Sequence, residues 1–231
     1  MQLKPTLSYC VGVLLLTLTL PIFAANDDPL EGVNRKVFGF NEVLDRWIVK
    51  PSAKVYQWVM PGPLDRGVTN FFDNVGEVSN TINSGLQGDL RQSGKSLGRL
   101  VINTTVGIGG LFDVATDWGI EERNEDFGQT LAVWGVGDGP YIVLPLLGGR
   151  YLRDTLAIVP DTYISPLDHI DDVRVSNSLW ALKLLDKRAD LLDAEGLISG
   201  DRYTFIREIY IQQREVATSN GQVKDDFGDD F

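Results

Sequence analysis

The sequence predicts a mainly α-helical protein with a single domain, and two observations lead to this prediction. Apolar residues recur every three or four positions in most segments of the chain, which is the spacing of one face of an amphipathic helix. Prolines and glycines fall between these segments, where helices begin, end or bend. The chain has 231 residues, enough for one domain of ordinary size with its own core.

Residues 1–24 are predicted to be a signal peptide. Lys4 precedes an apolar run at residues 11–20, which Pro21 ends, and small residues follow. We expect cleavage after Ala24, with cleavage after Ala25 as the second choice. The run is shorter than the roughly 20 apolar residues that a membrane-spanning helix needs. The mature protein is therefore predicted to be exported.

Cys10, the only cysteine, lies before this apolar run. A lipidated cysteine would follow the run and become the first residue of the mature chain, so residues 7–10 (LSYC) make a poor lipidation motif. We therefore predict a signal peptide without lipid attachment. The mature chain would then contain no disulfide, and its fold would depend on packing.

The first half of the chain predicts successive amphipathic helices. Asp27-Asp28-Pro29 is typical of a helix start, and the first apolar stripe ends or kinks at Lys50-Pro51. A short helical piece covers residues 52–60, and further helices cover residues 71–86 and 89–105. The apolar stripes of the three long helices are formed by Val33, Val37, Phe40, Leu44 and Trp47; by Phe71, Val75, Val78, Ile82 and Leu86; and by Leu90, Leu97, Val101 and Thr104.

In the second half, the glycines of residues 107–110 end the preceding helix, residues 111–118 form a short helical turn, and residues 119–126 form an acidic loop. We expect a helix at residues 150–158 and an irregular segment at residues 160–172. Two helices follow at residues 173–194 and 201–218. Residues 219–231 are predicted to be a flexible acidic tail.

The segment at residues 134–149 (WGVGDGPYIVLPLLGG) is unusual because it is apolar and yet rich in glycine and proline. Taken alone, it predicts a β-hairpin in which residues 130–134 pair with residues 141–144 around a Gly-Asp-Gly turn. A phosphate-binding loop is disfavoured, because the spacing of the glycines does not match the known motifs and no strand–helix alternation surrounds it.

The apolar stripes allow two interpretations. They can meet in a shared core, which is the usual purpose of an amphipathic helix. Alternatively, some of them can face lipid, as in helices that lie in a membrane interface.

The composition disfavours several classes of function. The net charge of −11 would repel phosphate backbones, so no nucleic-acid partner is expected. His169 is the only histidine, which excludes histidine pairs as zinc ligands. Asp168, Asp171 and Asp172 lack the spacing of a calcium loop. We therefore expect no cofactor, no metal and no catalytic residue.

Three segments, taken in order, resemble a known family. They are DPLEGVNR at residues 28–35 continuing to FxFNxxxD at residues 38–45; VxNTTxGxGGLFDVA at residues 101–115; and EDFGQTL at residues 125–131 continuing through GVGDGPY at 135–141 and LP at 144–145 to RD at 153–154. These motifs resemble the MlaA family, also called VacJ, of Gram-negative outer-membrane proteins.

The resemblance implies a ring-shaped helical domain at residues 25–218, held in the inner leaflet of the outer membrane on its periplasmic side. It implies that phospholipid misplaced in the outer leaflet is removed through a central amphipathic channel and delivered to a soluble periplasmic carrier, which maintains lipid asymmetry. Trimeric porins are implied as partners. Many family members are lipoproteins; without a suitable cysteine, this chain is expected to be retained by helix embedding and partner contact.

Two alternative functions remain open. One is a periplasmic structural or adaptor protein that binds a porin or another envelope partner without moving lipid. The other is a lipid hydrolase that uses His169.

The resemblance also suggests site residues. Phe40 and Asn41 would lie where the first helix meets the ring, and Arg150 and Arg153 would contact lipid headgroups, because guanidinium binds phosphate in a bidentate manner. The arginines can equally pair with local acids such as Asp154 and Asp161. In the family setting, residues 135–147 are interpreted as a helix-bounded bend beside the channel, with these candidate residues: Gly135, Gly137, Gly139, Pro140, Tyr141, Leu144, Pro145 and Leu147.

Overall fold

The computed structural model describes residues 28–219, and most of them are helical. The predicted signal peptide with Cys10, and nearly all of the predicted acidic tail, lie outside the described residues. The elements of the first half are α1 (Glu31–Leu44), η1 (Asp45–Val49), α2 (Lys50–Val59), α3 (Gly62–Leu86), α4 (Leu90–Thr105) and α5 (Val114–Asp117).

The second half contains short helices, long helices and one hairpin. Its elements are α6 (Phe127–Val133), β1 (Tyr141–Leu144), β2 (Gly148–Tyr151), α7 (Leu152–Ile164), η2 (Pro166–His169), α8 (Val173–Asp190), η3 (Asp193–Leu197) and α9 (Arg202–Thr218).

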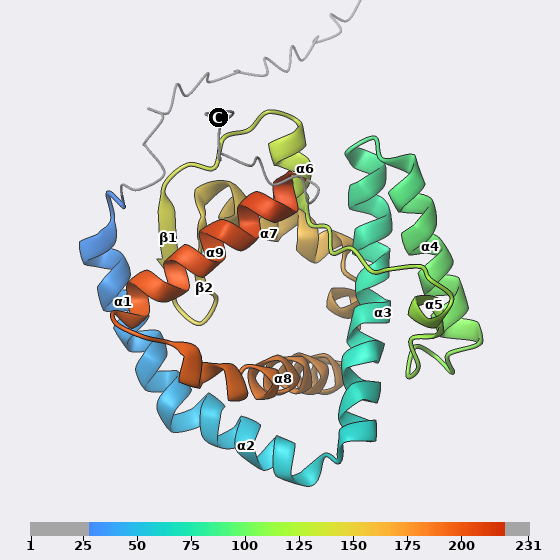
Figure 1. Ribbon diagram of the computed structural model, residues 1–231, viewed down its shortest axis with the longest axis horizontal. Coiled ribbons are helices and arrows are strands. Elements are labelled where there is room, and N and C mark those ends of the chain that lie inside the picture. The colour runs from blue at the N-terminus through green and yellow to red at the C-terminus, as the bar shows by residue number, and fades with distance from the viewer. Residues whose placement is uncertain (1–27, 220–231) are drawn as a thin grey trace, which may run out of the picture.

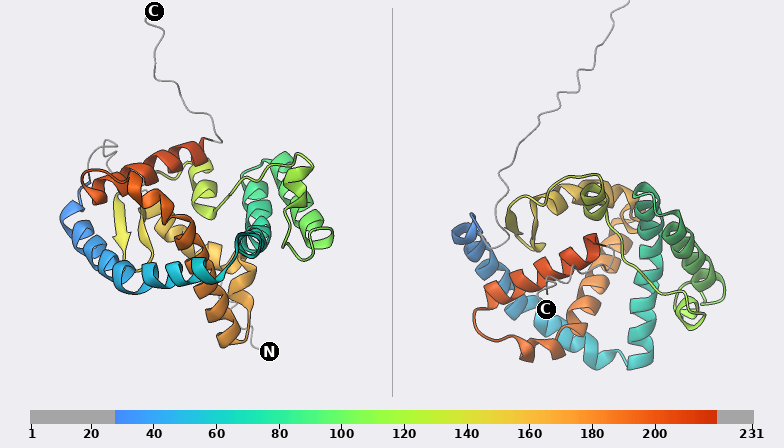
Figure 2. Two further views of the ribbon diagram at one scale, coloured as in Figure 1. Left: turned by 60° about the horizontal axis from the view of Figure 1, so that its bottom comes forward. Right: turned by 45° about the horizontal axis from the view of Figure 1, so that its top comes forward.

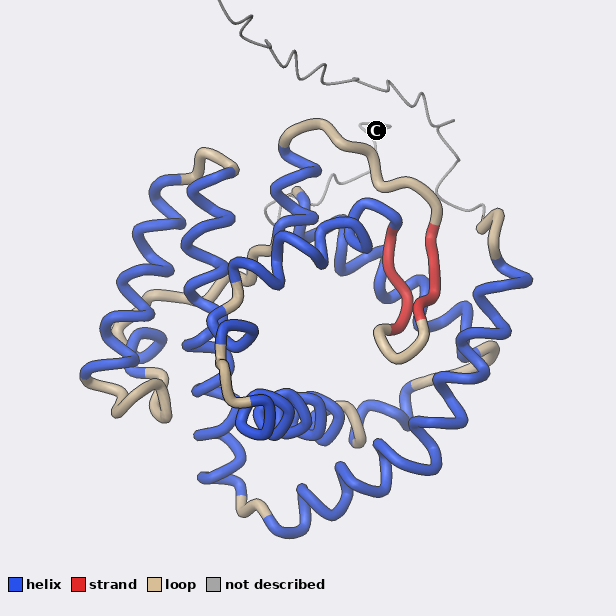
Figure 3. Tube along the Cα trace, turned by 180° about the vertical axis from the view of Figure 1, so that it is seen from behind, coloured by secondary structure: helices blue, strands red, loops and turns tan. Residues whose placement is uncertain are grey.

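The elements follow one another around a ring. Figure 1 shows α1, α2 and α3 along its outer arc, with the hairpin, α6 and α7 on the remaining side and α9 running in front of the hairpin and α7. α4 packs against the outer side of α3 (Figure 3). The end of α7 and the start of α8 extend to one side of the ring (Figure 2, left). The mainly helical, ring-like fold is therefore confirmed.

The helices of the first half agree with the sequence prediction. The expected kink near Pro51 takes the form of a π-helical turn, η1, between α1 and α2. Proline has no backbone N–H, so one helical hydrogen bond is missing here, and a π-turn is one way in which a helix accommodates such a disturbance. α3 starts earlier than expected because Pro63 occupies its first turn, a position that proline favours.

The predicted strand at residues 130–134 is wrong, because these residues belong to α6 and the Trp134 that follows it. Asp126 caps this helix: its Oδ1 atom accepts a hydrogen bond from the backbone N–H of Gln129 at 2.8 Å. An aspartate followed three residues later by glutamine is a helix-start pattern, and here it prevails over the β-forming tendency of the apolar residues.

A hairpin does form, but one segment later than expected. Tyr141–Leu144 pairs antiparallel with Gly148–Tyr151, so the segment expected as a helix-bounded bend lies between α6 and α7 but contains a strand. The chain turns at residues 145–147, where Leu146 has φ +66° and Gly148 has φ +76°. Gly149 allows a close approach: a β-carbon there would lie 1.8 Å from the Tyr141 hydroxyl.

The boundaries of the later helices also need correction. α7 begins at residue 152 and continues through Pro160 to residue 164, so the start of the predicted irregular segment is helical. α8 ends at residue 190 rather than 194.

Buried apolar side chains in the described part of the chain form two small clusters. One lies between α2 and α8 and contains Ala53, Tyr56 and Ala189. The other joins the hairpin to α1 and α9 and contains Tyr141, Val143 and Tyr203. Outside these clusters, most of the buried side chains among the described residues are polar or charged.

Candidate functional site

α3 and α4 bury polar side chains against each other and neighbouring segments. The buried side chains recur at helical spacing along each helix, as a core stripe normally does. They are Asn74, Glu77, Asn80, Asn83 and Ser84 on α3, and Gln92, Ser96, Arg99 and Asn103 on α4. Within this set, Glu77 accepts hydrogen bonds from Asn80 and Arg99, as buried polar groups normally require, whereas the hydroxyls of Ser84 and Ser96 have no partner among the described residues.

Arg99 lies at the centre of this polar interior, and only 1% of its surface is exposed. Its Nε atom donates to Glu77, and its Nη2 atom lies 3.2 Å from Asp113 and 3.5 Å from Glu122. Its Nη1 atom donates to Thr116 at 2.8 Å and to the carbonyl of Ile120. One guanidinium thus ties the α3–α4 pair to residues 113–122.

Carboxylates outnumber cations around Arg99, and this affects Glu122. Burial raises the pKa of Glu122, and the nearby negative charges of Asp73 and Glu77 raise it further. The positive charge of Arg99 lowers it, but the net result is a pKa of about 7. Glu122 therefore changes charge near neutral pH.

The apolar stripe of α4 is turned outward, and so is the end of the α3 stripe, at Ile82 and Leu86. Leu90 is 76% exposed and Val101 is 53% exposed. Exposed apolar side chains also occur on α2, where Trp58 is 86% exposed and where Val55 and Val59 line a cavity beside α8. We call the exposed side chains of these helices the apolar belt, and it comprises Val55, Trp58, Val59, Ile82, Leu86, Leu90, Leu97 and Val101.

An apolar belt over a polar interior is the reverse of ordinary globular packing. Contiguous exposed apolar surface indicates contact with a membrane or with another protein. The interpretation in which the helices bury all their stripes in a shared core is therefore wrong for α4. No helix within residues 28–219 is both long and apolar enough to cross a membrane.

The hairpin is attached to α1 by two asparagines. The Asn34 amide donates to the carbonyl of Tyr141 at 3.0 Å and accepts from the N–H of Val143 at 2.9 Å. Two turns further along α1, the Asn41 amide donates to the carbonyl of Leu144 and accepts from the N–H of Leu146, both at 2.9 Å. Each side chain bonds as a peptide group of a neighbouring strand would.

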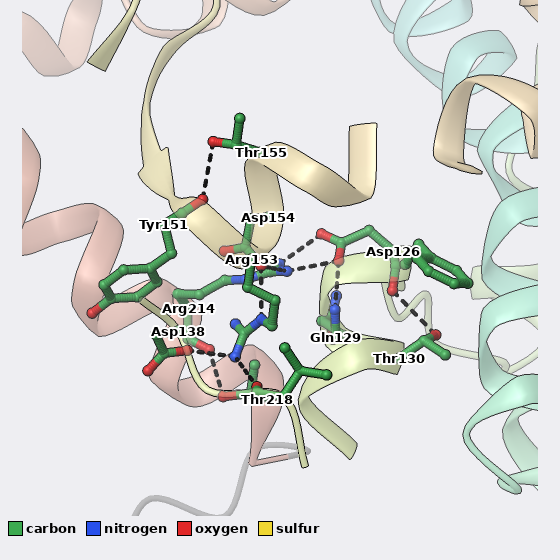
Figure 4. A network of polar contacts seen from close by, with 12 residues as sticks. Asp126, Gln129, Thr130, Asp138, Tyr151, Arg153, Asp154, Thr155, Arg214 and Thr218 are labelled. Carbon is green, nitrogen blue, oxygen red and sulfur yellow. Dashed lines mark hydrogen bonds and ion pairs between the residues drawn. The ribbon is translucent and has the colours of Figure 1, made fainter. Parts of the chain in front are cut away.

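Beside the hairpin, a chain of charges joins α6, α7 and α9 (Figure 4). Arg153 is buried; its Nε atom lies 3.1 Å from Asp154, and its Nη1 atom donates to Asp138. Arg214 donates to both oxygens of Asp126 at 2.6 and 2.7 Å and to Asp154 at 2.7 Å. The pairing of Arg153 with Asp154 matches one of the two interpretations of its role.

The proposed site residues fall into three groups. Asn41 meets Leu144 in the hairpin contact, whereas Phe40 is 52% exposed. The loop glycines 135 and 137 border a cavity of about 380 Å³ together with Arg153 and Thr218. The others lie in or beside the hairpin, where Arg150 donates to the carbonyl of Leu147 at 3.2 Å: Gly139, Pro140, Tyr141, Pro145 and Leu147.

His169 lies on the exposed turn η2 and places its Nδ1 atom 2.9 Å from the carbonyl oxygen of Ser165. The sequence analysis named Asp161 as a possible partner of the two arginines. Its carboxylate instead accepts a hydrogen bond from the N–H of Phe127 at 2.9 Å.

Sequence reasoning missed Asn34, Arg99 and the polar interior as structural centres. Their signal was present, because Glu77, Asn80, Asn83 and Ser84 repeat at helical spacing as regularly as the apolar residues do. Periodicity alone cannot tell which of two opposite stripes faces inward.

These features define a class of protein: a helical ring in which one helix pair buries polar side chains and exposes apolar ones. A family model described as "MlaA lipoprotein" matches residues 26–217. The chain therefore belongs to the MlaA family.

Individual relatives agree with this assignment. The chain is 38% identical over 203 residues to the intermembrane phospholipid transport system lipoprotein MlaA of Escherichia coli, covering 85% of this chain and 80% of the relative. It is 30% identical over 204 residues to the protein of the same name from Haemophilus influenzae, covering 85% and 81%.

One solved structure is similar in both fold and sequence. It comes from work on the "structural basis for maintenance of bacterial outer membrane lipid asymmetry". The match has a TM-score of 0.74 and 36% identity, and it covers 83% of this chain and 99% of the other.

Proposed function

We propose that this protein takes part in intermembrane phospholipid transport. It removes phospholipid misplaced in the outer leaflet of the outer membrane and passes it to the periplasmic side, which maintains lipid asymmetry. Membership of the MlaA family and the names of its relatives support this function.

The observation that carries the proposal is the reversed packing of α3 and α4. A surface with Leu90 and Val101 exposed is unfavourable in water, and burying one such side chain in lipid is worth about 1.5–3 kcal/mol. The polar stripes of both helices are buried between α3, α4 and the neighbouring segments, where Arg99 pairs with Glu77. Polar contacts thus hold the helix pair together and leave the apolar stripe of α4 for contact with lipid tails.

Location and partners form part of the proposal. The protein would lie in the inner leaflet of the outer membrane, retained by the apolar belt and by contact with a trimeric porin. A soluble periplasmic carrier would receive the lipid. Transport by such a path makes and breaks no covalent bond.

Arg150 and Arg153 are proposed to contact the headgroup phosphate. Arg153 already pairs with Asp138 and Asp154, but its buried Nη2 atom has no hydrogen-bond partner among the described residues, and the residue lines the cavity near Gly135. Transport that survives charge reversal at Arg150 would remove that residue from the site. The same change at Arg153 also tests its buried ion pairs.

The test of function is complementation in a strain that lacks this protein. We expect the gene to restore outer-membrane lipid asymmetry, measured as phospholipid in the outer leaflet. Lipid extraction from the purified protein, followed by mass spectrometry, should find bound phospholipid. A protein that restores nothing and carries no lipid, yet is recovered with a porin, would be an adaptor instead.

A further inference from the structure

Two cavities adjoin along one face of α9. The first, of about 430 Å³, lies between α1, the end of α8, η3 and α9. The second, of about 540 Å³, lies between residues 122–129 and the C-terminal part of α9. Gln213 lines both, so the two cavities adjoin at this residue, and we call them together the α9 groove.

The groove follows α9 for most of the helix. Its lining residues on α9 recur at helical spacing from Arg202 through Phe205, Ile209 and Gln213 to Ala217. At 1.5 Å per residue this stretch is about 22 Å long. One leaflet of a bilayer is about 15 Å thick in its hydrocarbon part, so the groove has room for an acyl chain and a headgroup.

The opposite face of α9 holds the helix in place. Tyr203 packs in the cluster with the hairpin, Tyr210 donates to Asp154 at 2.5 Å, and Arg214 binds Asp126. Because that face is anchored, the face along the groove is free to contact a ligand. Ile209 and Val216 there are 38% and 43% exposed.

The end of the groove nearest α1 combines apolar walls with charges of both signs. Phe38, Leu191 and Ile198 face the apolar residues of α9 across the cavity. The charged lining residues are Glu42, Asp45, Arg188, Glu195 and Arg202.

These charges leave donors and acceptors for a ligand. Arg188 is engaged by both oxygens of Asp45 at 2.7 and 2.8 Å and also by Glu195, which pairs with Lys50 as well. Arg202 is less committed: its Nε atom pairs with Glu42, its Nη2 atom lies 3.7 Å from Glu195, and its side chain is 36% exposed. A phosphate can therefore reach Arg202, while a cationic group can reach the carboxylates beside it.

We propose that the α9 groove holds one acyl chain of a zwitterionic phospholipid, with the headgroup phosphate at Arg202 and its ammonium at the carboxylate of Glu42. Lys50 also pairs with Glu195, so the three carboxylates at this end are matched by three cations. A headgroup with one charge of each sign keeps this balance, whereas an anionic headgroup adds a negative charge. The inference rests on the proposed transport function. It adds the class of lipid and the helix, α9, along which the acyl chain lies.

Photocrosslinking tests the position of the chain. The full-length protein is mixed with phosphatidylethanolamine vesicles that contain phospholipid bearing a diazirine midway along one acyl chain, and the labelled residues are mapped by mass spectrometry. We expect label on the groove face of α9, including Ile209 and Val216. Label on the apolar belt with none on α9 overturns the inference and leaves transport standing. A protein that neither carries phospholipid after extraction nor is labelled anywhere contradicts both.

A matched pair of variants tests the groove itself. Gln213 lines both cavities, and Glu215, two residues further on, does not line either. Gln213→Trp should reduce labelling of α9 about tenfold by filling the groove, and Glu215→Trp should leave it unchanged. Equal labelling in the two variants overturns the inference. If Gln213→Trp fails to fold, Ile209→Gln serves instead, because it makes the wall polar without adding bulk.

Competition tests the headgroup. Unlabelled phosphatidylethanolamine should displace the diazirine lipid from α9 at about a tenfold lower concentration than phosphatidylglycerol does. Equal competition, or stronger competition by phosphatidylglycerol, overturns the assignment of a zwitterionic headgroup.

Discussion

At the scale of single residues, polar side chains in this protein take over tasks that backbone groups or apolar packing usually perform. Asn34 is 1% exposed and completes the hydrogen bonds of the outer edge of β1. A strand edge left without partners inside a protein would keep buried N–H and C=O groups unsatisfied. The asparagine thus determines where the hairpin sits against α1.

Asn34→Ala should destabilise the fold by about 2–4 kcal/mol, because it leaves the N–H of Val143 and the carbonyl of Tyr141 buried without a partner. Asn41→Ala is the matched control: it removes the same pair of bonds where the partner Leu146 is exposed. Water can replace those bonds, so its cost should be about 1 kcal/mol. Urea unfolding in detergent measures both, and equal losses would contradict this role of Asn34.

Glu122 makes stability depend on pH. Its carboxyl has a pKa of about 7 in the folded protein, against 4.5 for an ordinary glutamate. Between these values the unfolded chain is ionised while the folded one holds a proton, so folding loses stability as pH rises from 4.5 to 7. Glu122→Gln removes this loss. The variant should be more stable than wild type at pH 8, by up to about 3 kcal/mol, and equal to it near pH 4.5.

Thermal unfolding at pH 4.5, 6 and 8 measures this difference. Comparing the two proteins at each pH cancels the titration of all other groups. The same replacement at the exposed neighbour Glu121 should change stability by less than about 0.5 kcal/mol at every pH. A difference between Glu122→Gln and wild type that does not vary with pH would contradict the explanation.

At the scale of elements, the sequence predicts helices well and their environment poorly. The boundaries of α4 are correct to within one residue, because an apolar stripe and the cap at Asp89 agree. Both stripes of such a helix are periodic, so only the neighbouring elements determine which one is buried. The first strand of the predicted hairpin is wrong for a related reason. Residues 130–134 are apolar enough for a strand, but the N-terminal cap at Asp126 favours the helix α6.

The candidate site was predictable in part. Motif resemblance places residues 135–147 beside the ring, and the structure brings Asn41 into contact with Leu144 there. The role of Asn34 and the α9 groove depend on contacts between residues more than 100 positions apart, which no local pattern contains.

The apolar belt on α4 gives a prediction at this scale. Replacing Leu97 and Val101 together with glutamine removes two exposed apolar side chains, each worth about 1.5–3 kcal/mol when lipid covers it. We expect binding to vesicles in a flotation assay to fall at least about tenfold, with thermal stability in detergent unchanged. Lys95→Gln, on an exposed polar position of α4, is the control and should float like wild type. Unchanged flotation of the double variant would show that the belt does not bind lipid.

At the scale of the whole molecule, the ring is closed by contacts between its first and last helices. Arg35 on α1 lies 2.5 Å from Asp201, just before α9, and Tyr203 donates to Asp28. Arg188 joins α8 to η1. At its other end α9 is fastened to α6 and α7 by Arg214 (Figure 4). These polar contacts let a ring with small apolar clusters keep one shape.

Arg214 is the contact whose loss should open the ring. Gly128 marks how close the groups lie, because a β-carbon there would be 2.3 Å from both Arg214 and Asp154. Burial alone would raise the pKa of Asp126, but the hydrogen bond and charge of Arg214 outweigh it and hold that pKa below its ordinary value. The resulting stability is present above the ordinary pKa of aspartate and is lost as pH falls below it.

Arg214→Met keeps the apolar stem but leaves the carboxylate of Asp126 without its cation and Asp154 with Arg153 alone, at a cost of about 3 kcal/mol. We expect protease cleavage between α8 and α9 to become faster at neutral pH, since α9 loses its attachment to α6 and α7. The difference from wild type should shrink below about pH 4, where the aspartates are protonated in both proteins. Arg46→Met, at an exposed position, should be cleaved like wild type. Because α9 also lines the proposed groove, a stable, uncleaved Arg214→Met variant would mean that other contacts hold this wall of the ring in place.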